Sequence, residues 1–385
     1  MALQLVKRIE KGAGFRVARS FCVAVHEKSL SQNNGEVLRN KRKPHVPVMV
    51  EEVLKYLDPS PGETFVDMTF GAGGHSARIL DSTPDTKIFA LDRDPVAHEY
   101  AKLMAEKYSG RVIPLLGRFS ELPQLLRKHK IQGNTIDGFL FDFGCSSMQF
   151  NVGSRGFSVV KNGPLDMRMD GNRCPNQPTA ADVLARATEE DLFRILKVYG
   201  EEKQAKKIAR AIIEARYTFK ELETTEELAK LVEATLDDES FISSTDDQSE
   251  VRRTDKLGRT AHLATKTFQA FRIFVNNELN EINYGILVAE KYLKISGRMI
   301  TIAFHSLEDT IVKRHLFGNI TDNMVNQSPL KYSNYNKFYN QSEVHHLTEV
   351  PWSMLHKHVL IPKADEIDAN PRARSAKFRA LVKVK

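Results

Sequence analysis

The chain has 385 residues, 41% of them apolar and 27% charged, a globular composition that excludes a wholly disordered, collagenous or coiled-coil protein. Lys and Arg outnumber Asp and Glu by 56 to 49, but residues 1–43 alone hold ten of these bases against three acids, so the remainder is balanced and would meet nucleic acid only through local patches. No apolar run approaches the roughly 20 residues that cross a bilayer, so we expect no membrane-spanning segment and no membrane partner. The three cysteines are too scattered for a disulfide framework or a zinc site, so we expect no bound metal and a reducing compartment.

Residues 1–43 form a basic N-terminal segment. Its Lys and Arg residues alternate with Leu, Val, Ile and Phe, and acids are few. This pattern is typical of a mitochondrial transit peptide. A disordered basic tail that contacts RNA or nothing at all is the alternative, and the pattern favours targeting.

Residues 44–155 show the pattern of an α/β domain. A helix is expected over 48–57, followed by near-continuous apolar runs over 64–69, 87–92, 111–116 and 136–144, with helical periodicity at 76–80, 95–108 and 120–129. Apolar runs of this kind predict parallel strands buried on both faces. Their alternation with helices predicts a doubly wound, Rossmann-like sheet.

Residues 156–263 interrupt this alternation. Helical periodicity from 179 to 236 begins three times after a threonine, at Thr179, Thr188 and Thr224, as expected of N-caps. Residues 237–250 contain six acids and no base, which indicates a solvated loop. We therefore predict an inserted, mostly helical domain.

Residues 264–385 return to the α/β pattern. We expect a long helix over 264–293, a strand over 297–306, and strands near 359–362 and 378–384. Residues 318–350 lack a period and are rich in Asn, Ser and Tyr, so we expect a long loop there.

The first strand leads into a glycine-rich turn, VDMTFGAGGHS, at residues 66–76. Glycines there allow close approach of a ligand to the backbone, and Asp92, 21 residues after Gly71, ends the next strand, where a carboxylate can bind ribose hydroxyls. A dinucleotide site would require a third glycine where Ser76 stands, whereas S-adenosylmethionine has no pyrophosphate and makes no such demand. The pattern favours the methyl donor over a dinucleotide, although a tight structural turn would also explain the glycines.

Residues 142–150 follow the fourth strand. This segment is short, polar and rich in small side chains, and it is expected at the carboxyl edge of the sheet, where open α/β folds bind ligands. Asp and Ser after a strand also commonly cap turns.

Several stretches, in chain order, resemble the RsmH/MraW family. They are His45–Leu57, Thr69–Ser76, Leu91–Pro95, Arg155–Ser158, Gly163–Asp170, Tyr199–Ile212, Thr265–Leu279, Phe304–Arg314 and Asn370–Arg379. The resemblance implies a class I methyltransferase fold that uses S-adenosylmethionine to methylate N4 of a cytidine in small-subunit ribosomal RNA. The chain departs from the family pattern at Ala72, Met148, Asn151 and Thr310, and Met148 stands where a proline would fix the turn before Gln149.

The resemblance also implies the roles of individual residues. Gly73, Gly74 and His75 would line the donor site, Asp92 would hold the ribose, Phe119 would pack on the adenine, and Asp142 and Gln149 would complete the pocket. We predict that Asp142, Ser146 and Ser147 act on the cytosine amino group. RNA contacts are expected from Arg168, His305, Ser306, Arg372 and Arg374.

The expected setting is the mitochondrial matrix, with small-subunit ribosomal RNA or a pre-ribosomal particle as partner and a homodimer or assembly-factor complex as further options. The non-catalytic alternative is an assembly factor that binds donor and RNA with little turnover. Two further enzyme classes are compatible with parts of the pattern: an amino-methyltransferase acting on DNA or another RNA and, more distantly, a nicotinamide dehydrogenase.

Overall fold

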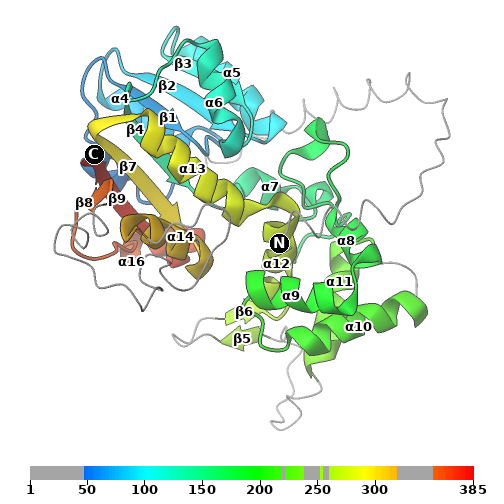
Figure 1. Ribbon diagram of the computed structural model, residues 1–385. Helices are drawn as coiled ribbons and strands as arrows, with labels where there is room; N and C mark the ends of the chain where they lie inside the picture. Colours follow the sequence, from blue (N-terminus) through cyan, green and yellow to red (C-terminus); the bar gives the residue numbers. More distant parts are fainter. Residues whose placement is uncertain (1–46, 219–221, 238–251, 255–259, 319–349) are drawn as a thin grey trace, which may run out of the picture. The chain divides into compact units, whose positions relative to one another are not determined.

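The computed structural model describes residues 47–218, 222–237, 252–254, 260–318 and 350–385 (Figure 1). The predicted transit segment 1–43 lies outside these residues, as do nearly all of the acidic loop and the loop expected over 318–350. No described helix is long and apolar enough to span a membrane.

A seven-stranded sheet forms the centre of the chain, with the order β3-β2-β1-β4-β7-β9-β8. The strands are β1 (Thr64–Asp67), β2 (Lys87–Asp92), β3 (Val112–Leu116), β4 (Ile136–Asp142), β7 (Leu293–Ala303), β8 (Trp352–Met354) and β9 (Lys377–Lys383). The first five in chain order pair in parallel, whereas β9 runs antiparallel to both of its neighbours. The predicted α/β fold with a Rossmann-like sheet is confirmed.

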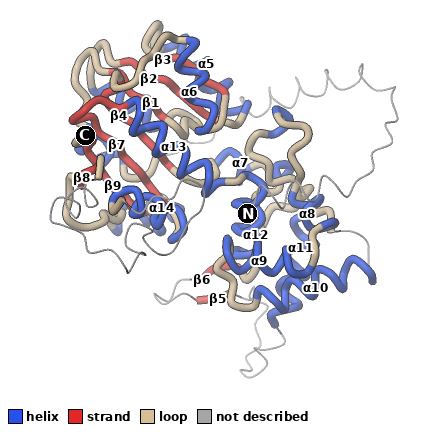
Figure 2. Tube along the Cα trace, viewed as in Figure 1, coloured by secondary structure: helices blue, strands red, loops and turns tan. Residues whose placement is uncertain are grey.

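Helices cover both faces of this sheet (Figure 2). The sheet-covering helices are α3 (Val50–Leu57), α4 (Gly74–Ser82), α5 (Pro95–Lys107), α6 (Leu122–Lys128), α13 (Glu278–Tyr292) and α14 (Ser306–Leu316). Successive strand residues point to opposite faces, so Phe65 packs with Val53 and Ile79 in one core, while Val66 packs with Phe141 and Ile286 in the other. The continuous apolar runs of the sequence therefore correspond to strands buried on both faces.

Residues 156–263, called the inserted segment below, are mostly helical between 180 and 237 in the described part of the chain. It contains α8 (Ala180–Arg186), α9 (Glu189–Tyr199), α10 (Ala205–Thr218) and α11 (Thr225–Asp237), followed by the short hairpin of β5 (Arg252–Thr254) and β6 (Thr260–His262). The three expected N-caps form: the hydroxyl oxygens of Thr179, Thr188 and Thr224 accept hydrogen bonds from the backbone N–H three residues later.

The single helix expected over 264–293 is wrong. Asn277 adopts a left-handed conformation, φ 52°, and divides the segment into α12 (Thr265–Asn276) and α13. The Tyr199 ring of α9 lies 6.2 Å from that of Phe274 in α12, whereas Ile286 of α13 packs in the sheet core. The break therefore lets α12 pack on the inserted helices and α13 on the sheet.

The C-terminal strands also differ from expectation. The strand near 359–362 is only a single bridge between Leu360 and Phe378, and the edge strand is β8, at 352–354. The sequence pattern missed β8 because three residues are too few to show a period.

Candidate functional site

The turn between β1 and α4 depends on two glycines in left-handed conformations, Gly71 (φ 54°) and Gly73 (φ 77°). A Cβ added to Gly73 would lie 2.5 Å from both Met104 Cε and Phe70 Cζ. Glycine is required there for its conformation and for the close packing.

Ser76 supports the end of β1. Its hydroxyl donates a 2.6 Å hydrogen bond to Asp67 Oδ2, and Thr69 N donates to Oδ1 of the same carboxylate. Burial raises the pKa of Asp67 above its ordinary value, although these hydrogen bonds oppose the shift. The residue that replaces a dinucleotide-type third glycine thus has a structural task.

Asp92 ends β2 beside this turn. Its Oδ2 accepts a hydrogen bond from Gly71 N at 2.8 Å, and its Oδ1 accepts one from Asp94 N at 2.9 Å. Burial raises the pKa of Asp92 to about 7. The Asp94 charge adds to this shift, and the two hydrogen bonds oppose it. Each carboxylate oxygen keeps a second lone pair that a ligand hydroxyl could use.

His75 and Asp142 come together from two different elements. His75 lies in the first turn of α4 and Asp142 ends β4, with Nε2 and Oδ2 3.6 Å apart. Thr69 Oγ1 accepts a hydrogen bond from Asp142 N at 2.7 Å, which fixes the end of the strand. Within the described chain, both His75 ring nitrogens and Asp142 Oδ1 are buried without a hydrogen-bond partner. Unpaired buried polar atoms are costly, so a polar ligand bound here would satisfy these three atoms.

Phe119 lies in the 3₁₀ turn after β3. Its ring packs edge-on against Phe141, with centroids 5.6 Å apart, and against α13 at Gly285, where an added Cβ would be 3.0 Å from both rings. The side chain is partly exposed, as an aromatic residue that contacts a ligand must be.

Helix α7 (Ser147–Asn151) follows Asp142 and is held by a capping box. Ser146 Oγ accepts from Gln149 N, and Gln149 Oε1 accepts from Ser146 N at 3.0 Å. This box forms with Met148 in place of the family's proline. Gln149 is buried, and its Nε2 donates to Asp94 Oδ2, so its amide anchors α7 to the start of α5. An added Cβ at Gly71 would lie 3.9 Å from Ser146 Cβ, which places Ser146 against the glycine turn.

Cys145 is the thiol nearest to these groups in sequence. Burial raises its pKa to about 11, and Arg272 only partly opposes this, so the thiol stays protonated at neutral pH. It is therefore poorly suited to act as a nucleophile.

The residues expected to contact RNA have protein partners of different kinds. Arg168 forms a two-pronged ion pair with Asp166. His305 is the N-cap of α14, with Nε2 2.9 Å from Glu308 Oε1, and the Ser306 hydroxyl donates a 2.5 Å hydrogen bond to Glu201 of the inserted segment. These three side chains are held in defined positions by the protein itself.

Arg372 and Arg374 are exposed. Arg372 reaches back to α7, where Nη2 donates to Asn151 Oδ1 at 3.1 Å and the guanidinium lies 5.6 Å from the Phe150 ring centroid. Arg372, in the C-terminal basic run of residues 371–385, thus adjoins α7, while Arg168, His305 and Ser306 come from other elements.

Comparison with known proteins identifies the family. Residues 42–384 match the family described as the MraW methylase family. The chain belongs to this family. A 47% identical relative from Mus musculus, aligned over 88% of this chain and 82% of its own length, is named 12S rRNA N(4)-cytidine methyltransferase METTL15. The Ribosomal RNA small subunit methyltransferase H of Parvibaculum lavamentivorans is 40% identical over 90% of this chain and 91% of its own length.

One further relative carries a different name. A 56% identical Culex quinquefasciatus protein, matched over 92% of this chain, is provisionally named a receptor-type tyrosine-protein phosphatase, mosPTP-1. This chain spans only 23% of that protein's length, so the name describes a much longer chain.

S-adenosylmethionine is the cofactor of this family, and the residues present fit it. Asp92 offers lone pairs for ribose hydroxyls, and His75 and Asp142 offer buried polar atoms that have no hydrogen-bond partner among the described residues. Asp94 was not among the site residues predicted from the sequence, but it caps α5 and accepts hydrogen bonds from Gln149 and Arg155. The Asp-Pro pair at the start of α5 is a helix-start signal that could have found it.

Proposed function

We propose that this chain transfers the methyl group of S-adenosylmethionine to the exocyclic N4 of a cytidine in small-subunit ribosomal RNA. The observation that carries the proposal is the 3.6 Å approach of His75, in the first turn of α4, to Asp142, at the carboxyl end of β4, in a member of the MraW family. Asp92 ends β2 at the same edge of the sheet. Ligands of open α/β sheets bind at this edge.

The donor would be held by groups from several elements. Asp92 would accept hydrogen bonds from the ribose, Phe119 would pack on the adenine, and the backbone at Gly73 and Gly74 would lie against the donor. His75 and Asp142 would supply polar contacts, while Gln149 would act by holding α7 in place. When bound, S-adenosylmethionine supplies an electrophilic methyl group.

Asp142 is the group best placed to act on the acceptor. The lone pair of a cytosine amino nitrogen is delocalised into the ring, so the nitrogen is a poor nucleophile. A carboxylate oxygen that accepts a hydrogen bond from this amino group favours its pyramidal form and can take the released proton. Asp142 Oδ1 is buried without a described partner, and Ser146 and Ser147 follow it at the start of α7, where their hydroxyls would orient the base.

The RNA would reach this edge with its target base unstacked. Arg372 and Arg374 would contact the phosphates near α7, and Arg168, His305 and Ser306 would contact the nucleotides around the target. The substrate would be ribosomal RNA or a pre-ribosomal particle, and the further partner would be a second copy of this chain or an assembly factor.

The test is methyl transfer to small-subunit ribosomal RNA by wild type, Asp142→Asn and Asp137→Asn. Asp137 lies near the opposite end of β4, where its carboxylate accepts from Thr64 N and pairs with Lys294, so it controls for loss of a strand carboxylate. We expect N4-methylcytidine, measured by mass spectrometry, to fall by about 100-fold or more in Asp142→Asn and to change little in Asp137→Asn.

Near-normal turnover in folded Asp142→Asn would remove Asp142 from the chemistry. A wild type that binds donor and RNA but forms no N4-methylcytidine would favour the assembly-factor alternative. Equal transfer to DNA or unrelated RNA would contradict the proposed substrate.

We place the enzyme in the mitochondrial matrix. The 12S ribosomal RNA named for the mouse relative and the basic composition of residues 1–43 support this location. Residues 1–43 fused to a fluorescent protein should direct it to the matrix, and a fusion that remains in the cytosol would contradict the assignment.

A further inference from the structure

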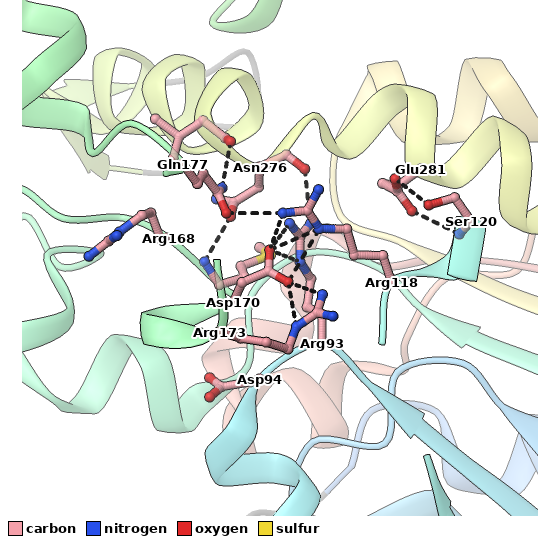
Figure 3. A network of polar contacts seen from close by, with 12 residues as sticks. Arg93, Asp94, Arg118, Ser120, Arg168, Asp170, Arg173, Gln177, Asn276 and Glu281 are labelled. Atoms are coloured by element: carbon pink, nitrogen blue, oxygen red, sulfur yellow. Dashed lines mark hydrogen bonds and ion pairs between the residues drawn. The ribbon is translucent and has the colours of Figure 1, made fainter. Parts of the chain in front are cut away.

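Three arginines contact one buried carboxylate in the inserted segment. Asp170 has no exposed surface, and it accepts hydrogen bonds from Arg93 Nε at 3.0 Å, Arg118 Nε at 3.2 Å and Arg173 Nε at 3.1 Å (Figure 3). Burial alone would raise its pKa, but Arg93 and Arg118 lower the pKa to about 2. The carboxylate is therefore ionised at physiological pH.

Two of these arginines are chain neighbours of predicted donor-binding residues. Arg93 lies between Asp92 and Asp94, and Arg118 directly precedes Phe119. Arg173 instead belongs to the inserted segment itself and pairs with Glu121 at 2.9 Å. Asp170 thus connects the inserted segment to the residues expected to hold the ribose and the adenine.

Further hydrogen bonds fix the same two arginines to α12. Arg93 Nη1 donates to Asn276 O at 2.9 Å, and Asn276, itself buried, holds the backbone of Met167 and Met169. Arg118 Nη2 donates to Gln177, whose Nε2 donates to Val275 O. Figure 3 shows Asn276 and Gln177 beside the arginines that contact Asp170. The arrangement joins three separate parts of the chain.

We propose that Asp170 is a positioning residue for the methyl donor, holding Arg93 and Arg118 so that Asp92 and Phe119 keep their binding geometry. This inference rests on the proposed function, because the roles of Asp92 and Phe119 come from it. A binding site tolerates displacements of only about 0.5 Å, so an anchored neighbour in the chain affects affinity. Loss of the Asp170 charge would leave the guanidinium groups of Arg93 and Arg118 without their shared partner. Repulsion between these two positive charges would then move the side chains apart.

The direct test compares Asp170→Asn with Asp309→Asn. Asp309 is also a buried carboxylate paired with an arginine, Arg379, but it joins α14 to β9 and touches no predicted donor residue. We expect the Kd for S-adenosylmethionine, measured by calorimetry on folded protein, to rise about tenfold in Asp170→Asn and to stay unchanged in Asp309→Asn. In turnover assays the KM for the donor should rise while kcat changes little.

A second pair of variants remains informative if Asp170→Asn does not fold. Lysine keeps the charge of an arginine but loses its two-pronged geometry. Arg118→Lys should weaken donor binding several-fold, whereas Arg379→Lys, which alters the arginine paired with Asp309, should not.

The outcomes separate this inference from the proposed function. Failure of wild type to bind S-adenosylmethionine would contradict the proposed function. A wild type that binds the donor, with unchanged affinity in folded Asp170→Asn or equal weakening in the two lysine variants, would overturn the positioning role of Asp170 alone.

Discussion

At the scale of single residues, Asp92 is the carboxyl that we propose binds the ribose of the donor. Burial raises its pKa to about 7. Ribose hydroxyls donate more strongly to an ionised carboxylate than to a protonated one. We therefore expect the affinity of wild type for S-adenosylmethionine to rise between about pH 6 and pH 8. Asp92→Asn should bind the donor weakly and should lack this rise of affinity with pH. Calorimetry of both proteins with the same donor isolates the Asp92 contribution, and identical pH profiles would contradict it.

The same pKa shift predicts a pH dependence of stability without donor. The pKa of Asp92 is about 7 in the folded state against 3.8 as the ordinary value, so the folded state binds more protons than the unfolded state in this window. The free energy of unfolding should therefore fall as pH rises from about 4 to 7 and then level off. Urea unfolding should show wild type losing stability relative to Asp92→Asn over this range. A constant difference between the two proteins would refute the shift.

At the scale of elements, the turn from β1 into α4 depends on Gly73. Gly110 has a similar φ, +74° against +77°, but an added Cβ there would meet no atom within 4 Å. Gly110→Ala should therefore cost only the backbone strain, about 1–2 kcal/mol. Gly73→Ala adds the collision with Phe70 and Met104, so it should lose more stability by urea unfolding and also lose donor affinity. Equal costs for the two variants would show that the turn absorbs the extra methyl group.

Elements defined by local pattern were predictable from the sequence. The β1–β4 runs, the N-caps Thr179 and Thr188, and the position of Asp92 at a strand end all follow from nearest neighbours in the chain. The break at Asn277 did not, because its left-handed conformation lets α12 and α13 pack on different parts of the fold.

The candidate site was predictable to the same extent. The glycines, Asp92 and Asp142 are recognisable at strand ends, and the structure brings His75 to Asp142. The role of Asp170 depends on partners 77 and 52 residues away, Arg93 and Arg118, and no spacing rule connects such positions. Long-range ion pairs become visible only when the fold is known.

At the scale of the whole molecule, the structure divides the C-terminal basic run into two classes. Arg379 and Lys383 are buried: Arg379 pairs with Asp309, and Lys383 Nζ donates to Asn134 and to the backbone of Glu290 and Leu293. Arg372 and Arg374 are exposed, and Arg372 lies beside α7. Two of the six bases in residues 371–385 are thus buried and not available to phosphates, so the basic composition of this run overstates its capacity to bind RNA.

This division predicts how RNA binding depends on salt. Each phosphate contact to single-stranded RNA contributes about 0.7 to the slope of log K against log salt concentration. Arg372→Ala and Arg374→Ala should each lower the slope by about this amount, measured by fluorescence anisotropy with a small-subunit ribosomal RNA fragment. Lys87→Ala, an exposed charge at the amino end of β2 and thus at the opposite edge from Asp92, should leave it unchanged. Arg379→Ala should instead lower stability by roughly 3–5 kcal/mol, because it leaves Asp309 buried without its main partner. An equal fall of the slope in Lys87→Ala would mean that RNA is held by overall charge rather than at the edge that carries Asp142.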